Sequence, residues 1–319
     1  MTDTPIIEAR GLAKTFTVHR KAGRLRRRRE EVHAVSGVDL LIEPGAMVGY
    51  IGPNGAGKST TIKMLTGILV PSAGQVRVDG LEPSRQRTEL ASRIGVVFGQ
   101  RSQLWWDLPL RDSFDLLRHV YRVPAGRHAQ NLDRLATGLD LGPLLDVPVR
   151  QLSLGQRMRG ELTAALLHDP SILLLDEPTI GLDVVSKEAV REFLLEVNQE
   201  QGTTVLLTTH DLADVERLCE RLVIIDRGTL IEDSTVAGIT ARYGTERTLV
   251  VDLAEPGPPL QVDGARVTRV EGPRQWLRFR RDDVSAAEVL NRVTAQAEVR
   301  DLAIEEPDIE SIVREIYGG

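Results

Sequence analysis

Three short segments of this 319-residue chain carry side chains suited to phosphate chemistry. The first, "GPNGAGKST" at residues 52–60, matches the pattern G-x-x-x-x-G-K-[ST]. Its glycines let the backbone approach an anion closely, and freed N–H groups together with a following helix N-terminus form an anion site. We expect Lys58 to reach the β- and γ-phosphates of a nucleotide, and Ser59 to hold Mg²⁺ through its hydroxyl.

The other two segments end in polar side chains after an apolar run. "ILLLDEP" reads as a buried strand that ends at Asp176 and Glu177, and "TTVLLTTH" reads as another that ends at His210. Ligands bind at the carboxyl ends of strands in open α/β sheets. We expect Asp176 to complete the Mg²⁺ shell and Glu177 to orient or deprotonate the attacking water. A lone histidine is more often structural, but the position of His210 at this edge favours a functional role.

The surrounding pattern supplies the elements that must position these groups. Residues 1–43 alternate apolar and polar, which predicts antiparallel strands, and residues 46–51 and 94–98 read as buried strands. A helix is expected over about 58–69, and the pattern is helical from about 101 to 160. Strand–helix alternation then returns, which is typical of a parallel sheet covered on both faces.

The character of the chain changes near residue 240. Prolines and period-two strands follow, then a helical "VSAAEVLNRVTAQ", a further strand and a short closing helix. We therefore expect a main α/β domain over residues 1–240, with a helical subdomain at about 101–160, and a separate small α+β domain over residues 246–319.

Composition excludes several classes of protein. The net charge of −6 argues against general nucleic-acid binding. The apolar runs are far shorter than the roughly 20 residues that a membrane span needs, and the N-terminus shows no signal peptide. The only cysteine, Cys219, excludes an internal disulfide and reads as a small buried hydrophobe. We expect a cytosolic chain, or one bound to a membrane through something else.

One basic run departs from this acidic balance. "RKAGRLRRRREE", residues 20–31, has no apolar periodicity and reads as an insertion. A solvated loop, contact with a membrane partner or anionic lipid, and contact with nucleic acid remain open for it.

The segment "LSLGQ", residues 152–156, lies shortly before "LLLDEP" and is the most specific motif of the chain. With the phosphate loop and the carboxylate strand, it makes residues 5 to 240 resemble the nucleotide-binding subunit of an ATP-binding cassette (ABC) transporter. The resemblance implies an ABC-type P-loop NTPase fold: a mostly parallel core sheet, an N-terminal antiparallel β subdomain and a helical subdomain. It also implies ATP and Mg²⁺ as ligands, and a head-to-tail dimer that buries two ATP molecules.

The physical logic of this signature is a helix N-terminus, which Ser153 can cap and where Gly155 lets the backbone reach phosphate. The resemblance implies that this signature closes on the ATP held by a second subunit. It also implies that Asp183 reaches across the dimer. It further implies that Phe16 stacks on adenine and that Thr60 contacts the α-phosphate.

The residues expected at the site are therefore as follows. The nucleotide-binding set is Phe16, Gly52, Pro53, Asn54, Gly55, Ala56, Gly57, Lys58, Ser59, Thr60, Ser153, Gly155, Gln156 and Asp183; the catalytic set is Glu177, His210 and Gln100; the metal-binding set is Ser59, Gln100 and Asp176. The resemblance gives Gln100 the role of touching Mg²⁺ or water and linking hydrolysis to the membrane partner. Two features depart from the family pattern: Leu154 replaces the usual glycine of the signature, and the basic insertion follows Phe16.

Two of the three tryptophans, Trp105 and Trp106, stand side by side shortly after Gln100. In the resembled family this segment lies in the groove that receives a coupling helix of the membrane subunit, and large amphipathic rings are favoured interface anchors. We expect at least one of them to contact that partner; packing of both in the core is the alternative.

The leading interpretation is an ATPase that powers export through a separate permease, at the cytoplasmic face of the cell membrane and as a dimer, for which a homodimer is expected. The residues of the motifs and the C-terminal domain resemble those of the ATPases of bacterial drug and antibiotic exporters. The C-terminal domain is expected to regulate the ATPase or to support the dimer. The alternatives are the energy subunit of an importer, a soluble relative acting on ribosomes or nucleic acid, and a regulatory module without hydrolysis. The retained Lys58, Asp176, Glu177 and His210 argue against the last of these.

Overall fold

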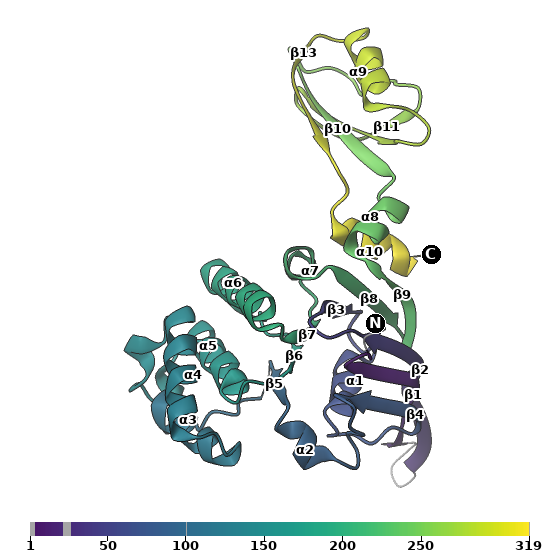
Figure 1. Ribbon diagram of the computed structural model, residues 1–319. Coiled ribbons are helices and arrows are strands. Elements are labelled where there is room, and N and C mark those ends of the chain that lie inside the picture. The colour runs from purple at the N-terminus through teal and green to yellow at the C-terminus, as the bar shows by residue number, and fades with distance from the viewer. Residues whose placement is uncertain (1–3, 22–26, 100, 319) are drawn as a thin grey trace. The chain divides into compact units, whose positions relative to one another are not determined.

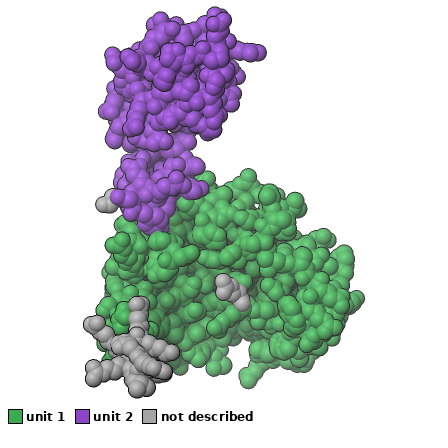
Figure 2. Space-filling model, turned by 180° about the vertical axis from the view of Figure 1, so that it is seen from behind, with its two compact units in different colours: residues 1–233 green, residues 234–319 purple. Residues whose placement is uncertain are grey.

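The computed structural model describes residues 4–21, 27–99 and 101–318, and the chain divides into two compact units, residues 1–233 and 234–319 (Figure 2). The sequence predicts that the second domain starts at residue 246. In the structure the preceding helix also belongs to the second unit, because it packs against the last helix of the chain.

The central element of the first unit is a six-stranded sheet (Figure 1). Its strand order is β5-β6-β7-β3-β8-β9, with bounds β3 Met47–Ile51, β5 Ile94–Phe98, β6 Ile172–Asp176, β7 Thr204–Thr208, β8 Arg221–Asp226 and β9 Thr229–Thr235. Strands β5, β6, β7, β3 and β8 pair in parallel. β3 and β7 are buried along their whole length, as continuous apolar runs in a covered parallel sheet predict. The parallel sheet confirms the predicted α/β fold.

An antiparallel sheet precedes it in the chain. β1 (Ile7–Lys21) pairs with both β2 (Arg27–Ile42) and β4 (Ala73–Val78), so that its order is β2-β1-β4. Helix α1 (Lys58–Leu65) contributes Ile62, Met64 and Leu65 to one apolar cluster with buried side chains of both sheets. This shared core fixes the N-terminus of α1 against the end of β3.

Most helices of the first unit occupy positions where the sequence predicts helix, but the short helix Arg87–Ala91 was not predicted and one expected stretch is not helical. They are α2 Arg87–Ala91, α3 Leu110–Val120, α4 Ala125–Gly138, the 3₁₀ turns Gly142–Leu144 and Val149–Gln151, α5 Leu154–Leu166, α6 Val184–Gln201 and α7 Leu212–Leu218. Residues 101–109 were expected to be helical, but they form an irregular segment. Pro109 explains where helix α3 begins, because a proline disfavours helical backbone in the residue before it.

The second unit has a hydrophobic core of its own. Its sheet has the order β11-β12-β10-β13, with β10 Glu246–Leu253, β11 Ala265–Glu271, β12 Arg274–Arg280 and β13 Val299–Glu305. Helix α9 (Ala286–Thr294) buries Val289 and Val293 in one cluster with Leu249, Leu277 and Phe279 of the sheet. Two further helices, α8 (Val236–Tyr243) and α10 (Ile309–Gly318), pack on each other.

Within the described part of the chain, none of the helices combines the length and the apolar character needed to cross a membrane.

Candidate nucleotide site

The loop between β3 and α1 is held by close approaches that only glycine permits. Gly57 has φ 109°, and a Cβ on it would lie 2.4 Å from the carbonyl oxygen of Ala34. A Cβ on Gly52 would lie 2.5 Å from the carbonyl oxygen of Ile225, at the end of β8. The loop therefore packs directly on β2 and β8, which directs its N–H groups and the start of α1 away from the core.

Lys58 lies inside this loop. Its side chain is only 6% exposed, and the ammonium Nζ donates to the carbonyl oxygens of Gly52 at 2.5 Å and Pro53 at 3.3 Å. Burial lowers the pKa of Lys58, while the charges of Glu177 and Asp176 act in the opposite direction. The ammonium thus joins the end of the loop to its beginning, near the carboxylates of Asp176 and Glu177.

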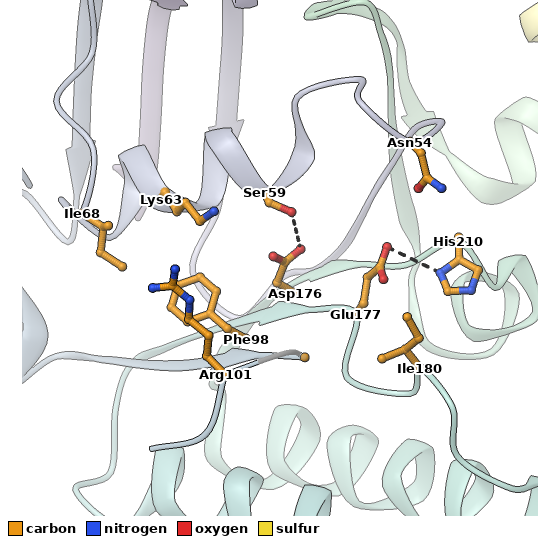
Figure 3. Close-up of a pocket in the computed structure, with 11 residues that line it drawn as sticks. Asn54, Ser59, Lys63, Ile68, Phe98, Arg101, Asp176, Glu177, Ile180 and His210 are labelled. Carbon is orange, nitrogen blue, oxygen red and sulfur yellow. Dashed lines mark hydrogen bonds and ion pairs between the residues drawn. The ribbon is translucent and has the colours of Figure 1, made fainter. Parts of the chain in front are cut away.

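The end of β6 brings Asp176 next to Ser59 (Figure 3). The Ser59 hydroxyl donates to Asp176 Oδ1 at 3.1 Å, and Thr208 at the end of β7 donates to the same oxygen at 2.7 Å. A carboxylate and a hydroxyl side by side form a hard oxygen pair of the kind that Mg²⁺ prefers. Ser59 and Asp176, two of the three residues expected to hold the metal, therefore fit it in chemistry and lie side by side.

Glu177 has an unusual backbone. Its φ of 56° is in the left-handed region, and its N–H donates to the carbonyl oxygen of Thr208 at 2.9 Å. For a residue other than glycine, asparagine or aspartate this conformation is uncommon and costs on the order of 1–3 kcal/mol. The turn directs the Glu177 side chain toward His210, whose Nδ1 lies 3.5 Å from Oε1 of the carboxylate (Figure 3). His210 itself is 57% exposed.

Ser59, Asp176, Glu177 and His210 line one cleft of about 710 Å³. Asn54, Ser59, Asp176, Glu177 and His210 form one part of its wall, and Lys63, Phe98 and Arg101 continue it (Figure 3). The cleft therefore joins the phosphate loop to the carboxyl ends of β5, β6 and β7. Its placement agrees with the edge at which the sequence predicts the site.

Two other predicted positions relate to this cleft in different ways. Phe16 lies on β1 opposite Val32, with the ammonium of Lys14 5.4 Å from its ring centre, and it is not among the described residues that line the cleft. Gln100 lies outside the described residues.

The signature segment forms the start of α5, as the sequence predicts. Ser153 is the N-cap: its hydroxyl accepts from the N–H of Gln156 at 3.2 Å, and the Gln156 side chain accepts from the N–H of Ser153 at 2.8 Å. A Cβ on Gly155 would lie 2.5 Å from Oγ of Ser186 on α6. Asp183 caps α6 by accepting from the N–H and the hydroxyl of Ser186 at 2.9 and 2.7 Å. These hydrogen bonds lower the pKa of Asp183.

The signature therefore packs on α6 rather than on the phosphate loop of the same chain. Among the described residues that line the cleft, none comes from residues 152–156 or is Asp183. The signature and the carboxylate edge belong to separate parts of one chain surface.

Trp105 and Trp106 are both on the surface, with 40% and 54% of their area exposed. The Arg157 guanidinium of α5 lies 5.8 Å from the ring centre of Trp106. The alternative in which both rings pack in the core is therefore wrong.

Sequence reasoning missed Thr208 and Glu161. Thr208 is a polar residue at the end of an apolar strand, and that position at a ligand-binding edge is a signal that can be read from the sequence. Glu161 is buried inside α5, and its partners lie far away in the chain, so no local pattern identifies it.

Residues 35–180 match the protein family described as "ABC transporter". Similar curated proteins include the ABC transporter ATP-binding protein NatA of Bacillus subtilis, which is 32% identical over 70% of this chain and 90% of its own length. The daunorubicin resistance ATP-binding protein DrrA3 of Streptomyces coeruleorubidus is 36% identical over 70% of each chain, and the methionine import ATP-binding protein MetN 3 of Shouchella clausii is 31% identical over 79% and 72%.

Solved structures agree with these matches. A dimeric ATP-binding cassette in a post-hydrolysis state, bound to ADP and Pi, superposes with a TM-score of 0.62 and 26% identity, over 72% of this chain and 98% of that one. The fold, the phosphate loop and these relatives lead to one conclusion: the chain belongs to the ATP-binding, ATP-hydrolysing subunits of ABC transporters.

Proposed function

We propose that this chain binds ATP with Mg²⁺, hydrolyses it as a homodimer, and powers export of a substrate through a separate membrane permease. The observation that carries the proposal is the convergence of the phosphate loop, Asp176, Glu177 and His210 on one cleft.

The phosphate loop is assigned to the nucleotide. Backbone N–H groups of Asn54, Gly55 and Gly57 and the N-terminus of α1 would attract the phosphates, and Lys58 adds a positive charge inside the loop. Thr60 is assigned to the α-phosphate and Phe16 to the adenine ring. Ser59 and Asp176 would hold Mg²⁺, with Gln100 as the expected further ligand; when bound, the ion neutralises phosphate charge.

Glu177 is assigned to the attacking water. Its carboxylate stands one residue beyond Asp176 on the rigid end of β6, so it can accept a hydrogen bond from water and orient it toward the phosphate. His210 lies 3.5 Å from Glu177. It can contact both the carboxylate and the terminal phosphate and so fix their relative positions. The strained backbone of Glu177 is consistent with a position selected for function rather than for stability.

The working unit is a dimer in this proposal. Ser153, Gly155, Gln156 and Asp183 lie away from the cleft of their own chain, so they are placed to close on the nucleotide of a second copy. The N-terminus of α5, with its capped but otherwise unpaired N–H groups, provides the anion site for that contact. The similar cassette, which is a dimer bound to ADP and Pi, supports a dimer as the working unit.

Trp105 and Trp106 are assigned to the permease. They are exposed, and their segment follows β5, the edge strand of the six-stranded sheet. Through this contact the chain would lie at the cytoplasmic face of the cell membrane. Export is proposed because of the likeness to a daunorubicin resistance protein and because of the residues of the motifs. The likeness to a methionine import protein keeps import as the second candidate.

The direct test of hydrolysis uses two variants at the cleft. Glu177→Gln is expected to bind ATP, to lose hydrolysis by at least about 100-fold and to accumulate as an ATP-dependent dimer in light scattering. Lys58→Ala is expected to lose ATP binding and therefore dimerisation. A Glu177→Gln chain that hydrolyses ATP at the wild-type rate would contradict the assigned role.

The partner is tested by isolating the tagged chain from native membranes. A membrane protein at comparable amounts, lost in Trp106→Ala while ATP binding persists, supports the permease; its identity separates export from import. Recovery with ribosomes or DNA would instead favour the soluble ATPase alternative.

A further inference from the structure

Glu161 is a carboxylate buried in the middle of helix α5, with only 4% of its area exposed. Its side chain accepts a hydrogen bond from the hydroxyl of Ser102 and another from the N–H of Gln103 at 3.1 Å. Burial raises the pKa of Glu161, and these hydrogen bonds act against that shift. An ionisable group so deeply buried is costly to keep, and the donors to its carboxylate belong to the irregular segment 102–104.

The same helix face is shaped to receive this segment. A Cβ on Gly160 would lie 2.9 Å from a methyl of Leu110 and 3.1 Å from one of Leu104, so the absence of a side chain there lets the segment approach. The side-chain amide of Gln103 also donates to the carbonyl oxygen of Val96 on β5 at 3.3 Å, and to that of Glu161 at 3.4 Å. Residues 102–104 are therefore hydrogen-bonded both to α5 and to strand β5 of the six-stranded sheet.

The segment stands between the cleft and the exposed tryptophans. Just before it, Arg101 lines the cleft and its N–H donates to Phe98, while the N–H of Gly99 donates to the carbonyl oxygen of Asp176 at 2.9 Å. Just after it come Trp105 and Trp106. Along the chain, residues 102–104 therefore connect the tryptophans to the residues beside the Asp176 edge.

Helix α5 extends the connection to the signature. Ser153 caps its N-terminus, whereas near its C-terminus Ala165 packs on β5 so closely that a Cβ on Gly95 would lie 2.4 Å from the Ala165 carbonyl oxygen. Glu161 lies about one turn before that fixed contact. The segment is thus attached to α5 near the point where the helix is held against the sheet.

We propose that Glu161 is a positioning residue, which holds residues 102–104 on α5 and thereby couples the Trp105–Trp106 surface to the nucleotide cleft. The coupling to hydrolysis rests on the proposed function; the holding of the segment does not.

The test compares wild type with Glu161→Gln, Ser102→Ala and the double variant, in the full-length chain. Glu161→Gln keeps the size of the side chain but loses one acceptor oxygen, and Ser102→Ala removes the partner from the exposed side. The matched control is Asn131→Ala. Asn131 is also buried, and its amide donates to the carbonyl oxygen of Leu167 at 2.9 Å and to Asp169 at 3.0 Å, away from residues 102–104.

Hydrogen exchange measures the holding directly. Protection of the amides of residues 103–105 is expected to fall roughly fivefold or more in Glu161→Gln and in Ser102→Ala, and to stay unchanged in Asn131→Ala. The double variant is expected to lose less than the sum of the two single effects, because both changes disrupt the Ser102–Glu161 contact, while Glu161 also accepts from Gln103 and Ser102 also accepts from the N–H of Leu104. Unchanged protection in Ser102→Ala and Glu161→Gln would overturn the proposal.

ATPase kinetics measure the coupling. The value of kcat is expected to fall about tenfold in Glu161→Gln with KM for ATP nearly constant, since a misplacement of about 1 Å can cost as much as about 100-fold. Asn131→Ala should retain kcat. Lost protection with an unchanged kcat would overturn the coupling. A wild-type chain without ATPase activity would refute the proposed function instead, and hydrogen exchange would still decide whether Glu161 holds the segment.

Discussion

At the scale of single residues, Glu177 combines the position expected for catalysis with an unfavourable backbone. Its left-handed φ follows directly after the last residue of β6, where the chain leaves the sheet edge. The N–H of Glu177 itself donates to the carbonyl oxygen of Thr208, so the surrounding structure holds this conformation.

This strain can be measured by comparing glycine with alanine. Glu177→Gly is expected to be about 1 kcal/mol more stable than Glu177→Ala in urea denaturation, because glycine adopts positive φ without a Cβ clash. The control is Glu192, an exposed position inside α6, where the order should reverse by about 1 kcal/mol. The same order at both positions would show that Glu177 is not strained.

Cys219 provides a second test at this scale, on pH dependence. Burial raises the pKa of its thiol to about 12, and the charge of Asp214 adds to this shift. The reactive thiolate should therefore stay scarce in the folded protein from pH 7 to 9, whereas an exposed thiol ionises in that range. Labelling with a disulfide reagent should be slow and should become fast only after unfolding. Rapid labelling of the folded chain at pH 8 would contradict this assignment.

At the scale of elements, helix N-termini perform two different tasks in this chain. The N-termini of α5 and α9 both carry a capping box, formed by Ser153 with Gln156 and by Ser285 with Glu288. Both boxes satisfy N–H groups at the start of their helix, but only the first belongs to the signature.

The two caps form a matched pair of variants. Ser153→Ala and Ser285→Ala are each expected to destabilise their helix by about 1 kcal/mol. Only Ser153→Ala should lower ATPase activity and ATP-dependent dimerisation, because Ser285 lies in the second unit. Equal loss of activity in both variants would show that the effect of Ser153 is one of stability alone.

At the scale of the whole molecule, the two units have separate hydrophobic cores. The sheet and helix α9 of the second unit bury their own apolar cluster, and α8 packs with α10 inside the same unit. We propose that this unit regulates the ATPase or supports its dimer.

Separate cores predict separate folding. A fragment of residues 234–319 is expected to unfold cooperatively in urea, as followed by circular dichroism, and a fragment of residues 1–233 is expected to keep ATP binding. If the second unit supports the dimer, the shorter chain should also need more ATP to dimerise. A fragment 234–319 without a cooperative transition would contradict independent folding.

Local sequence determined much of this protein. The glycines of the phosphate loop, the apolar runs that lead to Asp176 and His210, and the Ser153 cap act through neighbouring residues, so their pattern predicts strand, loop and helix in the right order. The placement of the site beside Asp176 and Glu177 follows from the rule that ligands bind at the carboxyl ends of parallel strands.

Only the tertiary structure decided the contacts between distant segments. The bonds from Thr208 and Ser59 to Asp176, and those from residues 102–103 to Glu161, join residues far apart in the chain, and no periodicity encodes such partners. The irregular course of residues 101–109 has the same cause: the segment is held by Glu161 and Ser113, whose hydroxyl accepts from the N–H of Trp105, instead of by hydrogen bonds of its own helix. Exposure of both tryptophans follows from that course, because it takes them out of any helical face that packs on the core.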